Sequence, residues 1–206
     1  IIRRLKLWKA FFENTGGQGL SHEKQIGLFG ELDILEQLIV EKGPSVIQYW
    51  KGPNSAAQDF QFESSAVEVK STANEYKTSV TISNLQQLDR ENLEKLYLGF
   101  MRYETFQESG TSLPELIDRI FLLVSKNKWA DTLGEKLLGQ GYCAQDSFRY
   151  KMGYIRRDAL FFDVVDSFPK IIRKAIPSQI TEVSYSIDLK QCSDYAVGFK
   201  TICAKI

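Results

Sequence analysis

The hydrophobic positions in the first half of the chain follow first a helical and then a strand period. In the segment 21–42, apolar residues recur at spacings of four, three and four, namely Leu28, Leu32, Leu35 and Ile39. This spacing predicts a long helix with Ser21 as its N-cap, ended by the pair Gly43-Pro44. Short, partly alternating segments follow, separated by Gly, Pro, Asn or Ser, at 46–50, 57–62, 66–72 and 78–83. Four such strands in succession predict an antiparallel meander.

The rest of the chain mixes the two periods. The pattern predicts helices at 84–96, 112–124, 128–139 and 169–176, and strands at 97–106, 148–155, 159–165 and 182–189. A short amphipathic helix is also expected at 3–13. From this order we expect an α/β fold in three parts: the helical end of an upstream region (1–19), a core (20–106) and a C-terminal α+β extension packed on it (107–206).

The charges of the chain restrict its partners. Lys and Arg number 26, as do Asp and Glu, so the formal net charge is +0. This balance excludes attraction of the whole molecule to DNA or to an anionic membrane, so any contact with a polyphosphate must come from a local basic face. Candidate basic clusters lie at 3–9, 149–157 and 170–174.

The residue inventory excludes other kinds of site. His22 is the only histidine, so histidine triads and multi-histidine metal sites cannot form. The three cysteines lack a CxxC spacing, which favours a reducing compartment. No apolar run is long enough to span a membrane. We therefore expect a cytoplasmic protein without membrane contact.

The segment DFQFESSAVEVK holds the side chains with the clearest chemical potential. Alternation along a strand places Glu68 and Lys70 on one face and the two valines on the other. If the hairpin turns at Glu63-Ser64, Asp59 lies directly across from Glu68. Two adjacent carboxylates are stable as anions mainly with a cation between them, and oxygen ligands suit Mg²⁺. A neighbouring lysine can orient or deprotonate an attacking water.

A third carboxylate lies on the helix expected at 21–42. At about 100° per residue, Glu31 falls about 70° from the centre of the leucine and isoleucine stripe, on the apolar side of the helix. A carboxylate on that side needs a partner. A metal site between this helix and the sheet would supply one.

These segments occur in an order that is similar to a known family. GLFGELDIL, WKGP, QDF, EVKST and QQL resemble the PD-(D/E)xK nuclease superfamily, and specifically the bacterial PD-(D/E)xK motif proteins found near restriction-type defence genes. SLPELI, LGQGY and SYSIDL extend the resemblance over nearly the whole chain. It implies a restriction-endonuclease-like nuclease core at 20–106, with a mixed sheet flanked by helices. The chain departs from the motif at Gln58, where the motif has proline.

The resemblance implies roles for five residues. Asp59 corresponds to the motif aspartate, Glu68 and Lys70 to the (D/E)xK triplet, Glu31 to the acid of the first core helix, and Gln87, or its neighbour Gln86, to the glutamine after the fourth strand. Asp59, Glu68 and Glu31 are then the expected metal ligands. The implied ion is Mg²⁺, with Mn²⁺ as a substitute.

The expected function is Mg²⁺-dependent DNA endonuclease activity in restriction or phage defence, by phosphodiester hydrolysis that leaves a 5′-phosphate. One alternative is a catalytically silent nuclease-fold subunit that binds DNA or a partner protein in a defence complex. Another is a structural α/β adaptor in which the carboxylates are ordinary surface charges. DNA is the expected partner, and contacts with other defence proteins and a homodimer are left open.

Overall fold

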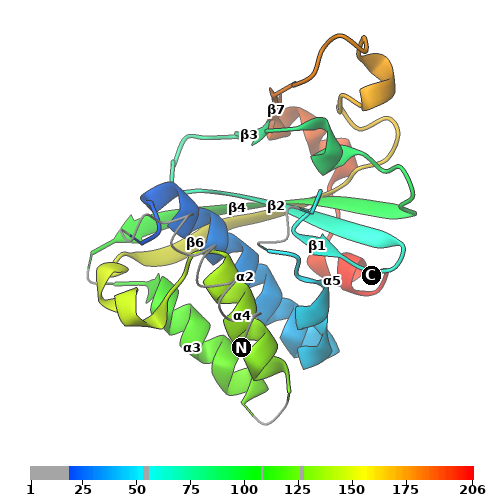
Figure 1. The fold of residues 1–206 in the computed structure, drawn as a ribbon. Coiled ribbons are helices and arrows are strands. Elements are labelled where there is room, and N and C mark those ends of the chain that lie inside the picture. The colour runs from blue at the N-terminus through cyan, green and yellow to red at the C-terminus, as the bar shows by residue number, and fades with distance from the viewer. Residues whose placement is uncertain (1–18, 53–55, 108, 126–127) are drawn as a thin grey trace.

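The computed structural model describes residues 19–52, 56–107, 109–125 and 128–206 (Figure 1). The helix expected at 3–13 lies outside these residues. The described chain is built around a five-stranded sheet in the order β1 (Phe60–Gln61), β2 (Ser65–Thr72), β4 (Lys95–Phe106), β6 (Gly153–Asp163) and β5 (Thr111–Ser112). Strands β2 and β4 are parallel, and the other neighbours are antiparallel.

The sheet buries both of its faces. One face packs against the helices α2 (His22–Lys42), α3 (Leu113–Val124), α4 (Trp129–Gly139) and α5 (Phe199–Cys203). The other packs against a two-stranded sheet of β3 (Ser79–Ile82) and β7 (Tyr185–Asp188), together with the 3-10 helix η5 (Leu189–Tyr195). Figure 1 shows the small sheet and the long helices on opposite sides of the main sheet. The remaining 3-10 helices are η1 (Pro44–Tyr49), η2 (Leu85–Leu88), η3 (Ala144–Arg149) and η4 (Arg173–Ala175).

The long first helix forms where its sequence predicts it. Ser21 caps α2 by accepting a hydrogen bond from the backbone N–H of Lys24 at 3.3 Å. At the other end Gly43 adopts a φ of 88°, and its N–H donates to the carbonyl of Ile39, which stops the helix. The predicted α3 is also confirmed, with a capping box between Ser112 and Glu115.

The predicted meander is wrong. Strand β3 leaves the main sheet to pair with β7, and β2 pairs with β4 in parallel. A parallel pair needs a crossover of about a dozen residues or more, which the segment between β2 and β4 provides. That segment holds β3 and only a short 3-10 turn, η2, where a helix was expected at 84–96.

Three further elements differ from their predictions. The apolar run 46–50 lies largely in the 3-10 helix η1, with Pro44 in its first turn, because the buried Val46 and Ile47 reach the core equally well from a tight helix. The two strands expected at 148–155 and 159–165 are replaced by η3 and the single long strand β6. At 169–176 only η4 is helical.

The α/β class, with a mixed sheet flanked by helices as in a restriction-endonuclease-like core, is confirmed. Strand β6 adds directly to the edge of β4, so residues beyond 106 contribute to the same sheet. The division of the chain at 19 and 106 stays a prediction. Among the described residues, no helix combines the length and the apolar character that crossing a membrane requires.

Candidate active site

The hairpin of β1 and β2 brings two carboxylates together. Its register pairs Phe60 with Val67, and the turn closes at residues 63–64 as predicted, where the N–H of Phe62 donates to the carbonyl of Ser65. Extended by one residue, this register sets Asp59 opposite Glu68. The carboxylate of Asp59 also bridges to the next strand, since its Oδ2 accepts a hydrogen bond from the N–H of Val69 at 2.7 Å.

Lys70 and Glu68 share the face of β2 that carries the chemistry. The Lys70 Nζ lies 2.7 Å from Glu68 Oε1, which is the distance of a charge-assisted hydrogen bond. Val67 and Val69 are buried in the hydrophobic core, as alternation predicts. Glu68 is itself only 2% exposed, so its charge is far less hydrated than that of an ordinary strand-edge residue.

Glu31 accepts hydrogen bonds from two residues that were not among the predicted site residues. The fully buried indole of Trp50, which follows η1, donates from Nε1 to Glu31 Oε2 at 2.7 Å. Gln140, at the end of α4, donates to the same oxygen at 3.3 Å. The partner expected for this carboxylate is therefore at least in part the protein itself. A signal for Trp50 existed, because a buried indole N–H needs an acceptor.

Burial makes the three carboxyl groups hard to ionise. It is the main cause that raises the pKa of Asp59 to about 6 and that of Glu68 to about 8, and the negative charge of Asp59 adds to the shift of Glu68. The pKa of Glu31 is raised well above its usual value, first by burial and then by the charge of Asp59. Lys70 lowers all three pKa values but does not offset burial. Such a cluster is stabilised when its carboxyl groups are protonated or when they bind a cation.

The side chain of Gln87 bonds to the backbone of its own turn, and the described residues show no hydrogen bond between it and these four residues. Its Oε1 accepts a hydrogen bond from the N–H of Ser83 at 2.9 Å, within the turn that leads into η2. Gln58, which replaces the proline of the motif, is buried and donates to the carbonyl of Gln86 at 2.7 Å. This bond ties the segment that leads into β1 and carries Asp59 to η2. The catalytic role of Gln87 stays a prediction.

The chemistry of the carboxylates fits a hard divalent cation. Asp59 and Glu68 supply adjacent oxygen ligands, and Mg²⁺ is commonly bound through one or two carboxylates while it keeps several waters. No group of three or more His, Cys, Asp or Glu side chains placed to hold a metal ion occurs in the part of the chain that the structure describes. The pair has the ligand chemistry that such an ion prefers, and the binding of an ion by Asp59, Glu68 and Glu31 stays a prediction.

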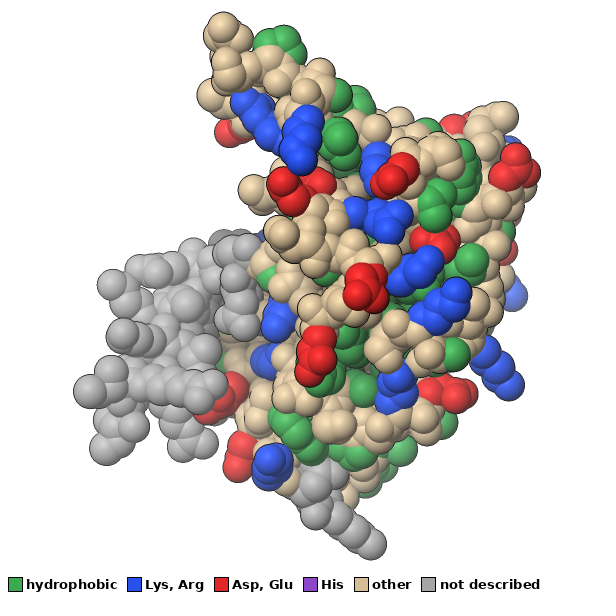
Figure 2. All heavy atoms as spheres, turned by 90° about the vertical axis from the view of Figure 1, so that its right-hand side faces the viewer, with side chains coloured by type: hydrophobic (Ala, Val, Ile, Leu, Met, Phe, Trp, Pro, Cys, Tyr) green, Lys and Arg blue, Asp and Glu red, His purple; other side chains and the backbone are tan. Residues whose placement is uncertain are grey.

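The basic cluster at 149–157 is largely neutralised. Arg156 pairs with Asp33 at 2.9 Å, and Arg157 donates from Nε to Glu104 at 2.6 Å. Figure 2 shows positive and negative side chains interspersed over the face that it presents. The cluster at 3–9 lies outside the described residues. Arginines held in these surface ion pairs are less available to phosphates.

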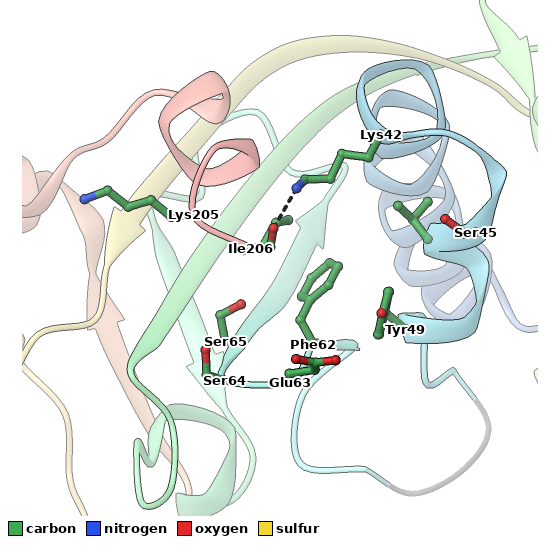
Figure 3. A pocket seen from close by; sticks show the side chains of 10 residues that line it. Lys42, Ser45, Tyr49, Phe62, Glu63, Ser64, Ser65, Lys205 and Ile206 are labelled. Carbon is green, nitrogen blue, oxygen red and sulfur yellow. Dashed lines mark hydrogen bonds between the residues drawn. The ribbon is translucent and has the colours of Figure 1, made fainter.

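A separate cavity lies beside the β1–β2 turn. It has a volume of about 350 Å³ and lies between the end of α2, η1, the β1–β2 turn and the last residues of the chain (Figure 3). Lys42 reaches across it to donate to the carbonyl of Ile206 at 2.6 Å. None of the predicted site residues lines this cavity. We therefore do not assign the chemistry to it.

Comparison with known proteins gives one match. The model of a family described as "Putative PD-(D/E)XK family member, (DUF4420)" matches residues 1–190. No curated protein and no solved structure matches the chain.

Proposed function

Since the chain belongs to this PD-(D/E)XK family and has a nuclease-type fold, we propose that it is a metal-dependent DNA endonuclease of restriction or phage defence. One observation carries the proposal: the convergence of Asp59, Glu68 and Lys70 at the β1–β2 hairpin, with Glu31 close enough to be affected by their charges. Buried carboxyl groups with raised pKa values beside a lysine are typical of a site built for chemistry. The defence context rests on the sequence resemblance alone, and the cytoplasmic location rests on the spacing of the cysteines and the lack of a long apolar run.

In this proposal Asp59 and Glu68 hold a divalent cation, Mg²⁺ with Mn²⁺ as a substitute. The ion would supply positive charge that polarises a phosphoryl oxygen and lowers the pKa of a bound water. The Lys70 Nζ, anchored by Glu68, holds or orients the attacking water through its remaining N–H groups. Trp50 and Gln140 keep Glu31 in one orientation at the edge of the site.

The test is cleavage of supercoiled plasmid DNA in Mg²⁺ or Mn²⁺, with EDTA as the control for metal dependence. Glu68→Gln should abolish cleavage, because a neutral amide binds a divalent cation poorly. Glu63→Gln is the matched control, since Glu63 is exposed in the turn of the same hairpin. Absence of cleavage in every metal, with DNA binding retained, would favour the catalytically silent subunit. Absence of DNA binding as well would favour the structural adaptor.

A further inference from the structure

Two lysines lie on segments that contact the part of the chain carrying the carboxylates, and neither belongs to the ion pair of Glu68 and Lys70. The N–H of Lys51 donates to the carbonyl of Asp59 at 2.7 Å, directly after the bridge between Trp50 and Phe60. Residues that face each other on antiparallel strands carry their side chains on the same face. Lys51 therefore projects from the face of the chain that carries Asp59.

The second lysine approaches from α4. The Nζ of Lys136 donates to the carbonyl of Gln48 at 3.2 Å and to that of Trp50. One helical turn later, Gln140 contacts Glu31. Lys136 thus connects α4, the helix whose end contacts Glu31, to the residue that precedes Lys51.

The charges of these two lysines are not balanced locally. Neither Lys51 nor Lys136 forms an ion pair within the described residues, whereas Arg156 and Arg157 both do. The Nζ of Lys136 contacts the carbonyl of Trp50, the residue before Lys51, and burial, and next the charge of Lys51, lower the pKa of Lys136 to about 8. Carbonyl capping accounts for two N–H groups of Lys136 and leaves a third. These carbonyl contacts do not balance the charge of Lys51.

An anion would balance the two cations. The net charge of the chain is zero, so attraction to a phosphate must be local. We propose that Lys51 and Lys136 together bind a phosphate of the DNA backbone that flanks the one to be cleaved. This inference rests on the proposed function, and it assigns DNA-backbone binding to α4 and the residues that follow η1.

The test measures binding of a short fluorescein-labelled DNA duplex by anisotropy across a series of NaCl concentrations, in Ca²⁺ and separately in EDTA. Lys51→Gln is the decisive variant, since the side chain of Lys51 makes no hydrogen bond or ion pair to the described residues and its loss should leave the fold intact. Lys136→Gln is measured beside it, with thermal unfolding to separate loss of carbonyl capping from loss of charge. Lys200→Gln is the matched control, because Lys200 is an exposed lysine of α5.

Affinity falls as salt rises, and loss of one phosphate contact makes the slope of log affinity against log salt shallower by about 0.9. Because the two lysines share one phosphate, we expect a shallower slope, by at most about this amount, and weaker binding for Lys51→Gln and for Lys136→Gln but not for Lys200→Gln. An unchanged slope for Lys51→Gln overturns the inference, as does a wild-type protein that binds no DNA. Cleavage by wild type with unaltered binding by Lys51→Gln refutes this inference alone. DNA binding that depends on Lys51 in a protein that never cleaves supports it and refutes the endonuclease proposal.

Discussion

The buried carboxyl group of Glu68 should make the metal-free protein lose stability as pH rises. Burial raises its pKa to about 8 in the folded protein from a usual value of 4.5, so the fold binds this proton more tightly than the unfolded chain does. The stabilisation is complete below about pH 4.5 and is lost as pH rises through about 8. A gap of about 3.5 pKa units, at about 1.4 kcal/mol per unit, gives an upper limit of about 5 kcal/mol. This is a large share of the roughly 5–15 kcal/mol by which domains are stable.

The assay is urea denaturation in EDTA at several values between about pH 5 and pH 8, followed by tryptophan fluorescence, for wild type and Glu68→Gln. We expect the unfolding free energy of wild type to fall with pH more steeply than that of Glu68→Gln, because the amide does not titrate. Glu63→Gln, in the exposed turn of the same hairpin, should keep the wild-type slope. Parallel lines for wild type and Glu68→Gln would refute the assignment of a buried, protonated carboxyl group.

Three further predictions concern the same site. Lys70→Ala should keep the fold, because Val67 and Val69 pack in the core, and should lower cleavage by at least about 10²-fold. A large fall in melting temperature with only a proportional loss of cleavage would show that Lys70 is a structural ion-pair partner of Glu68. Mn²⁺ binding, measured by calorimetry in buffers of different ionisation enthalpy, should release protons and tighten as pH rises through about 6 to 8, because the ion displaces protons from Asp59 and Glu68. If the double variant Asp59→Asn plus Glu68→Gln binds Mn²⁺ as well as wild type does, the ion is bound elsewhere. Trp50→Phe removes the donor to Glu31 and should cost about 1–3 kcal/mol in chemical denaturation, and an unchanged stability would show that the hydrogen bond is dispensable.

The elements that sequence predicts well here are those whose signals are local. Helix α2 carries its own cap, periodicity and terminating glycine within the segment 21–43. The hairpin register that sets Asp59 opposite Glu68 also follows from a short turn, because the turn fixes which residues face each other. Both features depend only on residues close to one another along the chain.

The errors arise where the partner of a segment lies far along the chain. Alternation at 78–83 correctly indicates a strand, but it does not specify that Val80 pairs with Ile187. When a strand could pair with either of two sheets, the packing of the whole molecule decides between them, and local alternation carries no information about that packing. The run 46–50 fails for another reason, since short buried apolar segments satisfy helix and strand templates equally.

The same distinction separates the parts of the site. Asp59, Glu68 and Lys70 lie within one hairpin, so strand alternation and the position of the turn are enough to bring them together. Trp50 could be anticipated in part, since a buried indole N–H and a carboxylate on an apolar helix face each require a partner of the other's kind. Lys136 and Gln140 gave no such signal, because an amine or an amide on α4 is equally well satisfied by water. Variants in α4 therefore test what the motif could not indicate, namely whether a helix outside the predicted core contributes to substrate binding.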